Sequence, residues 1–190
     1  MTHRALAPAA IAEGLEGMAA PWWIAGGWAL DLFAGGGLRG HDDLDVVLLR
    51  RDQAALAAQL ADWDLQVVSG GHLRAWDGTP LEPPEHELWA RRAPGDPWAC
   101  EFLLDEADGD RWLFRRDPRV SRPLAELGLE VAGLPVVAPE VALLFKAKEP
   151  DTRAESDFEA VLPLLDERRR GWLAAALAAV CPGHAWSARL

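Results

Sequence analysis

The pattern of hydrophobic and polar positions predicts alternating helices and strands over most of the chain. Apolar residues at helical spacing predict helices at residues 5–19, 26–35 and 53–62. Short apolar runs, several rich in β-branched residues, predict strands at residues 22–25, 43–51, 64–69, 86–92, 98–105 and 110–116. The last two strands are joined by the turn sequence EADG, which is typical of a hairpin.

The composition changes near Pro135, and from Pro139 the chain is predicted to be helical. Proline suits the first turn of a helix, and PEVALLFKAKE therefore opens a helix that two further helical segments follow. We expect an α+β fold with two parts. A mixed β-sheet core with flanking helices occupies residues 1–137, and a small C-terminal helical cap occupies residues 138–190.

Composition and charge narrow the possible partners. The 190 residues suffice for one substantial core, and 30 acidic against 19 basic residues give a net charge of −11. Nucleic acid needs basic patches, so no nucleic-acid partner is expected, whereas cationic small molecules would be attracted. The two cysteines are too few for a disulfide framework, which favours a cytoplasmic location. No apolar run is long enough for a membrane span, and Glu13 and Glu16 interrupt the N-terminal segment, which argues against a signal peptide.

Six glycines crowd the stretch from residue 25 to residue 40. Three of them satisfy G-x-G-x-x-G, but they follow a predicted helix and precede a strand, the reverse of the dinucleotide-binding context. Gly26 and Gly27 do stand between a predicted strand and a predicted helix. Backbone N–H groups at such a junction can bind phosphate, and glycine allows a close approach. A purely structural turn is the alternative.

Three aspartates follow within four positions, directly before an aliphatic run. In a strand, Asp43 and Asp45 share one face, so their carboxylates repel each other unless a cation lies between them. Mg²⁺ fits this role, usually with substrate phosphates in its shell. The alternative is a pair of solvated aspartates at the start of a strand. Asp42, on the other face, is expected to be a turn residue.

A third carboxylate is expected from the strand at 98–105. Glu101 stands among apolar neighbours, where an unpaired carboxylate is costly, and a strand beside 43–49 would bring it to the same metal. Asp105 shares its face and is the second candidate. The alternative for Glu101 is an ion pair with an arginine of the 110–116 strand. In that strand Arg115 and Arg116 alternate, so one of them is expected to face solvent.

The segments GGW (26–28) and RGHDDLDVVLLR (39–50) resemble the signature of the nucleotidyltransferase superfamily with the DNA polymerase β-like fold. The similarity is to its small aminoglycoside and lincosamide adenylyltransferase-like members. The resemblance implies that Gly26 and Gly27 hold the phosphates of a nucleoside triphosphate. It also implies that Asp43, Asp45 and Glu101 are the catalytic residues and bind Mg²⁺.

The resemblance extends through 112–119 and 143–165, with two departures. The 15 residues between Gly27 and Asp43 exceed the usual spacing, although the aminoglycoside-type branch has a similar insertion. The third acid is glutamate, where aspartate is more usual.

These features predict a Mg²⁺-dependent enzyme that transfers a nucleoside monophosphate to a hydroxyl of a small molecule. AMP from ATP is the simplest donor chemistry, and the negative charge suits a cationic, aminoglycoside-like acceptor. Two alternatives stay open: nucleotidyl transfer to a protein, as in antitoxin-type relatives, and a nucleotide-binding module without turnover. Nothing in the sequence decides the oligomeric state.

Other residues are weighed for supporting roles around the nucleotide. Lys146, and second to it Lys148, could reach the phosphates, and Asp157 could pair with one of the two. His41 is expected to be a polar turn residue or to hydrogen-bond a carboxylate or the nucleotide. One of three tryptophans could stack on a base: Trp63, Trp76 or Trp89.

Overall fold

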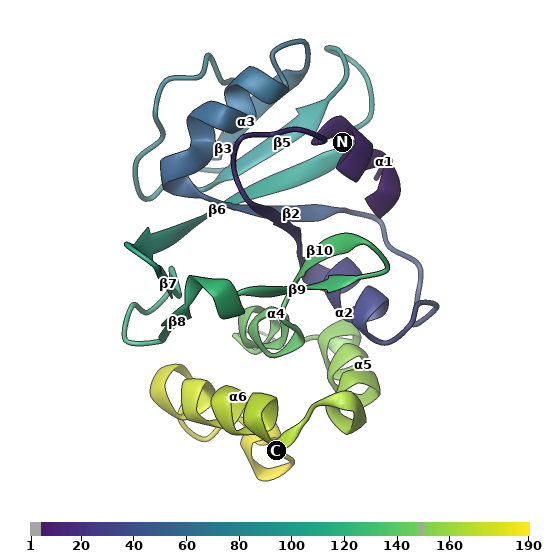
Figure 1. The fold of residues 1–190 in the computed structure, drawn as a ribbon, viewed down its shortest axis with the longest axis vertical. Coiled ribbons are helices and arrows are strands. Elements are labelled where there is room, and N and C mark those ends of the chain that lie inside the picture. Colours follow the sequence, from purple (N-terminus) through teal and green to yellow (C-terminus); the bar gives the residue numbers. More distant parts are fainter. Residues whose placement is uncertain (1–4, 149) are drawn as a thin grey trace.

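A computed structural model describes residues 5–148 and 150–190 as one mixed β-sheet with helices on both faces (Figure 1). The strands are β1 (Trp22–Ile24), β2 (Asp45–Leu49), β3 (Asp64–Ser69), β4 (His72–Ala75), β5 (Glu87–Arg91), β6 (Cys100–Asp108), β7 (Arg111–Leu113), β8 (Ser121–Pro123), β9 (Gly128–Val131) and β10 (Leu134–Val137). The α-helices are α1 (Pro8–Gly14), α2 (Gly26–Phe33), α3 (Gln53–Gln59), α4 (Pro139–Lys146), α5 (Thr152–Val161) and α6 (Glu167–Val180). Short 3₁₀ turns occupy Arg50–Asp52, Leu124–Glu126, Leu162–Leu164 and Ala185–Ala188.

The sheet combines parallel and antiparallel pairs. Its strand order is β4-β3-β5-β6-β2-β1-β10-β9, and β7 and β8 branch from the end of β6. The pairs β1–β10 and β2–β6 are parallel, whereas the other described pairs are antiparallel. The predicted α+β class with a mixed sheet and flanking helices is confirmed.

Alternation along β2 divides its side chains between two apolar clusters. Val46 and Leu48 are buried on one face, in the cluster that includes residues of α1 and α3. Val47 points to the opposite face and packs in the cluster that includes α2, α4, α5 and α6. Asp45 shares the face of Val47, because side chains two positions apart in a strand lie on the same side. The first residue of β2 therefore faces the C-terminal helices.

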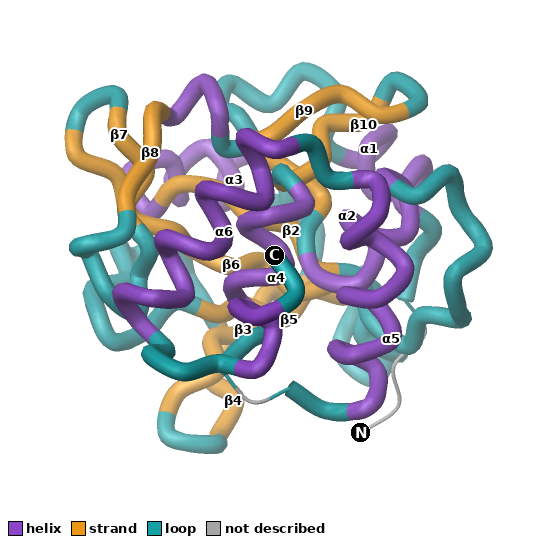
Figure 2. The backbone as a smooth tube through the Cα atoms, turned by 90° about the horizontal axis from the view of Figure 1, so that it is seen from below, coloured by secondary structure: helices purple, strands orange, loops and turns teal. Residues whose placement is uncertain are grey.

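The three C-terminal helices gather at one end of the molecule, and in Figure 2, which looks from that end, they lie in front of the sheet. Helix α4 begins at Pro139, as predicted. Helices α5 and α6 begin at the N-caps Asp151 and Asp166, whose carboxylates accept hydrogen bonds from backbone N–H groups. Because these helices share one apolar cluster with α2 and β10, they pack closely on the sheet. The division into a core at 1–137 and a cap at 138–190 stays a prediction.

Several predicted elements are shorter than their apolar patterns. Helix α1 ends at Gly14, within the predicted 5–19 segment, since glycine is a poor helix former and Gly17 has a left-handed φ of 75°. The strand expected at 43–51 begins at Asp45 and passes into a 3₁₀ turn at Arg50. The strand expected at 110–116 ends at Leu113, so Arg115 and Arg116 lie in a loop. Strands β4, β8, β9 and β10 were not predicted, because three or four residues leave little periodicity to detect.

The described helices are all too short or too polar to span a membrane.

Candidate active site

The turn from β1 into α2 brings backbone N–H groups beside the first carboxylate of β2. Ala25 N–H donates a hydrogen bond of 2.9 Å to the carbonyl oxygen of Asp45, which fastens the turn to the start of β2. Gly26 adopts a left-handed φ of 59°, and a Cβ atom there would collide with the Asp45 carboxylate. Glycine is therefore required at this position both for the backbone conformation and for the space that Asp45 occupies.

The strand register places Asp45 and Glu101 directly opposite each other. Strands β2 and β6 are parallel, with Asp45 aligned to Glu101, so both side chains point to the same face of the sheet. Asp43 lies in the extended segment before β2 and is close enough to act electrostatically on both carboxyl groups. The sequence prediction that these three acids converge agrees with this placement.

Glu87 joins this group from β5, and sequence reasoning missed it. Leu103 aligns with Glu87 on β5, so Glu87 lies on the same face as Glu101. Its charge raises the pKa of both Asp45 and Glu101. The alternation in HELWARR would have placed Glu87 on one face, but only the β5–β6 register shows which neighbours it meets.

The pKa values of Asp45 and Glu101 are raised by burial and by the neighbouring negative charges. Burial and then the neighbouring Asp43 carboxylate raise the pKa of Asp45 to about 6, against the attraction of Lys146. Burial and then Asp45 raise the pKa of Glu101 to about 8. A cation at this position would remove both penalties, so the donor set suits a hard, oxygen-seeking ion.

Within the described ranges, no three acidic, histidine or cysteine side chains form a complete metal-binding group. Mg²⁺ commonly takes only one or two carboxylates and fills its shell with water and substrate phosphates. The pair Asp43 and Asp45 therefore fits Mg²⁺ when a nucleotide supplies the remaining oxygen ligands.

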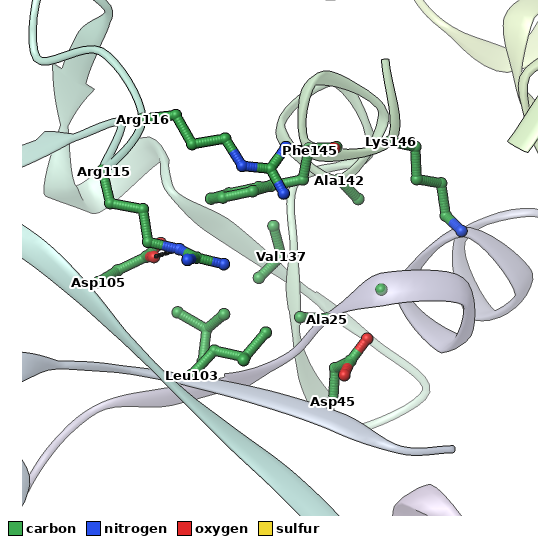
Figure 3. A pocket seen from close by; sticks show the side chains of 12 residues that line it. Ala25, Asp45, Leu103, Asp105, Arg115, Arg116, Val137, Ala142, Phe145 and Lys146 are labelled. Atoms are coloured by element: carbon green, nitrogen blue, oxygen red, sulfur yellow. Dashed lines mark hydrogen bonds and ion pairs between the residues drawn. The ribbon is translucent and has the colours of Figure 1, made fainter. Parts of the chain in front are cut away.

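A cavity of about 190 Å³ opens between the sheet and α4, beside Gly26 and Asp45 (Figure 3). Its apolar floor and wall come from β2, β6, β10 and α4. Charged side chains stand at its ends: Lys146 and Asp45 near the glycine turn, and Asp105, Arg115 and Arg116 on the other side. The cavity thus connects Asp45 to a group of cations, whereas Asp43, Glu87 and Glu101 do not line it.

Lys146 is held at the cavity by a buried carboxylate of α5. Its Nζ atom lies 3.1 Å from Oδ2 of Asp157, which is 2% exposed. Arg39 Nε donates to Oδ1 of the same carboxylate at 3.1 Å. The expected pairing of Asp157 with one of the two lysines is with Lys146. Lys148 does not line this cavity, although it lines neighbouring depressions.

The second candidate for the third carboxylate, Asp105, has a different environment from Glu101. It is 1% exposed, accepts a hydrogen bond of 2.7 Å from Trp112 Nε1, and pairs with Arg115. Burial raises the pKa of Asp105 to about 6. Asp105 aligns with Leu49 at the far end of β2, so Glu101 is the acid opposite Asp45. An arginine of the 110–116 segment does form a carboxylate pair, and its partner is Asp105.

Gly27 has another role than Gly26. A Cβ atom on Gly27 would collide with the Arg39 guanidinium and lie 3.0 Å from Nδ1 of His41, and Gly27 does not line the cavity. The His41 side chain is buried, stacks on Trp28 and lies 3.2 Å from the carboxylate of Asp31, so it packs the loop onto α2. Gly27 permits that packing, and its predicted contact with phosphate stays a prediction.

The tryptophans proposed for base stacking lie elsewhere. Trp76 is buried and donates a hydrogen bond to the carbonyl oxygen of Thr79. The Arg92 guanidinium stacks on the ring of Trp63. Trp89 packs edge-on against Trp98. None of the three lines the cavity. Asp42 is exposed and pairs with Arg153, which agrees with a turn residue outside the site.

Comparison with known proteins identifies proteins of similar sequence and fold. A family model described as aminoglycoside-2″-adenylyltransferase matches residues 9–70, which include the glycine turn, Asp43 and Asp45. Among solved structures, ANT(2″)-Ia in complex with adenylyl-2″-tobramycin superimposes with a TM-score of 0.54. The sequences are 21% identical, over 89% of this chain and 94% of that chain. The chain has the nucleotidyltransferase fold.

A second relative supports the same fold. The lincosamide antibiotic adenylyltransferase LnuA, bound to lincomycin, superimposes with a TM-score of 0.57 at 15% identity, over 82% of this chain and 94% of that chain. No curated protein matches the sequence. The resemblance to aminoglycoside and lincosamide adenylyltransferases is confirmed by the family model and the fold. The family model and LnuA are both described as adenylyltransferases, and they confirm the prediction of an adenylyltransferase-like enzyme.

Proposed function

We propose that this protein is a Mg²⁺-dependent nucleotidyltransferase that moves AMP from ATP onto a hydroxyl of a small cationic molecule. The observation that carries this proposal is the alignment of Asp45 with Glu101 beside the turn at Gly26, with Asp43 acting on both carboxyl groups. Carboxylates packed this closely repel one another, and a metal–nucleotide complex would offset the repulsion.

Each group has a defined task in this reaction. Asp43 and Asp45 would hold Mg²⁺, and the N-terminal N–H groups of α2 would face the phosphates. When bound, the ion neutralises the phosphate charge and orients the triphosphate. Lys146, which lines the cavity near Gly26, would contact the phosphate chain.

Glu101 is the proposed general base. Its side chain shares the face of Asp45, directly opposite it, and with Mg²⁺ bound it would be ionised and able to accept a proton. The acceptor oxygen attacks the α-phosphorus, the bond from that phosphorus to the bridging oxygen breaks, and pyrophosphate leaves. The hydroxyl proton passes to Glu101. Its role as a third metal ligand stays a prediction.

An aminoglycoside-like acceptor fits the charge of the molecule. The net charge is −11, and Glu87 and Glu101 add negative charge on the same face as Asp45. Amino groups of a polycationic acceptor would be attracted to this face. The ANT(2″)-Ia structure contains an adenylylated aminoglycoside, and LnuA binds lincomycin, which makes these two classes the first acceptors to examine.

The donor site can be tested by calorimetric titration with non-hydrolysable analogues of ATP, GTP, CTP and UTP, with and without Mg²⁺. We expect Mg²⁺-dependent binding of one nucleotide, lost in the Asp43→Asn, Asp45→Asn double variant and kept in Asp42→Asn, whose side chain is exposed. Equal binding by wild type and the double variant would contradict the metal assignment.

Turnover is tested separately, by mass spectrometry of aminoglycosides and lincosamides incubated with protein, ATP and Mg²⁺. Addition of AMP to an acceptor, lost in Glu101→Gln, is the expected result. Nucleotide binding with no modified acceptor of either class would contradict the proposed acceptor. Labelled ATP and candidate proteins would then distinguish a protein-directed enzyme from a silent module.

A further inference from the structure

A buried carboxylate at the far end of the cavity has no part in the proposed metal site. Asp105 is 1% exposed, and its Oδ2 atom accepts a hydrogen bond of 2.7 Å from Trp112 Nε1. Trp112 is itself fully buried, so it fixes the position of the carboxylate. A buried carboxylate is costly unless it is paired, and one indole donor does not balance its charge.

The balancing charge comes from Arg115. Its Nε atom lies 3.5 Å from Oδ1 of Asp105, and its side chain is 16% exposed. Among the described residues, neither this Nε nor Oδ1 makes a hydrogen bond. The guanidinium is thus held by charge at the cavity wall, where Figure 3 shows it pointing inward. Because its Nε atom is buried, the two terminal NH₂ groups are the donors that could bind a ligand.

The neighbouring Arg116 is held differently. Its Nη1 atom donates a hydrogen bond of 2.6 Å to the carbonyl oxygen of Phe145, which fastens this guanidinium to α4. Both arginines lie in the loop after β7 and line the cavity, and Arg116 is exposed, which agrees with the expectation that one of the two faces solvent. Arg115 pairs with the buried carboxylate of Asp105.

The size of the cavity indicates which part of a nucleotide it takes. Its volume of about 190 Å³ is below the roughly 300–1,000 Å³ of sites that hold a drug-sized ligand. An adjoining pocket of about 660 Å³ shares Arg115 and Arg116 and is also lined by Arg50, His86 and Lys148. A short anionic segment beside Arg115 fits this arrangement better than a whole nucleotide.

We propose that Arg115 binds the phosphate chain of the nucleoside triphosphate and the pyrophosphate released from it, and that Asp105 positions Arg115. This inference rests on the proposed function. A guanidinium can make two parallel hydrogen bonds to phosphate oxygens, and its positive charge offsets the charge that develops on the leaving group. Asp105, fixed by Trp112, keeps the guanidinium directed into the cavity.

The test is calorimetric titration of the full chain with three probes: inorganic pyrophosphate, a non-hydrolysable ATP analogue and AMP, each with Mg²⁺. Arg115→Ala should weaken binding of the first two by about 10- to 100-fold, the effect of losing charge-assisted hydrogen bonds, while AMP affinity stays unchanged. Arg119→Ala is the matched control. Arg119 lies in the same loop, is exposed and pairs with Asp117 outside the cavity.

Asp105→Asn separates positioning from binding. It retains an acceptor for Trp112 but removes the charge that holds Arg115, so pyrophosphate affinity should fall by less than in Arg115→Ala. In the Arg115→Ala, Asp105→Asn double variant, pyrophosphate affinity should be the same as in Arg115→Ala alone, because Asp105 acts only through Arg115. Thermal unfolding of each variant shows whether it is folded.

Three outcomes would overturn the inference: pyrophosphate affinity unchanged in Arg115→Ala, an equal loss for AMP, or no pyrophosphate binding by the wild type. Failure of the proposed function has a different signature. Arg115-dependent pyrophosphate binding without adenylylation of any acceptor would contradict the proposed acceptor chemistry and leave the assignment of Arg115 intact.

Discussion

At the scale of single residues, Gly26 determines whether the turn between β1 and α2 and the Asp45 carboxylate fit together. Gly26→Ala should lower the free energy of unfolding by more than about 2 kcal/mol, since alanine adds left-handed strain of roughly 1–2 kcal/mol and a collision with Asp45. Gly70→Ala is the matched control, with a φ of 57° and open space around its Cβ position. Urea denaturation compares the two. Equal losses would show that the carboxylate does not require glycine.

At the scale of elements, Asp157 of α5 connects α4 to the loop before β2 through Lys146 and Arg39. Lys146→Met leaves the buried Asp157 carboxylate paired with Arg39, so the free energy of unfolding should fall by less than about 1 kcal/mol. Nucleotide affinity should fall about tenfold, because one charge-assisted contact with phosphate is lost. Nucleotide titration and urea denaturation measure the two effects.

Asp157→Asn is the companion variant and should lower the free energy of unfolding more than Lys146→Met does. It leaves two partly exposed cations without their buried partner, and should cost about 2 kcal/mol, less than the 3–5 kcal/mol of a fully buried pair. If Lys146→Met destabilised the protein as much as Asp157→Asn, the main role of Lys146 would be to stabilise the fold and not to bind phosphate.

The elements also show what the sequence could predict. Asp43, Asp45 and Glu101 could be predicted because spacing along a strand sets which face each side chain takes, and Gly26 because it stands between a predicted strand and a predicted helix. The pairing of Asp105 with Arg115 was not predictable, since it depends on where β7 ends and how the following loop folds back. Glu87 was missed for a related reason, because its neighbours follow from the β5–β6 register, which alternation within one strand leaves undetermined.

At the scale of the whole molecule, the active-site carboxyls should make stability depend on pH. Asp45 and Asp105 have pKa values raised from 3.8 to about 6, and Glu101 from 4.5 to about 8. Between the unfolded and folded pKa values the folded state binds more protons, so the free energy of unfolding falls as pH rises. The loss begins near pH 4 and ends near pH 8.

We expect a loss of at least about 2 kcal/mol between pH 5 and pH 8 without Mg²⁺, since one unit of pKa shift corresponds to about 1.4 kcal/mol. Urea denaturation at several pH values measures it. The Asp45→Asn, Glu101→Gln variant should flatten the profile and be more stable than wild type at pH 8, because the repelling charges are removed. Mg²⁺ with a non-hydrolysable nucleotide should restore stability at pH 8 in the wild type only. A profile equally steep in the variant would mean that other groups carry the pH dependence, and that the acidic cluster is not under electrostatic strain.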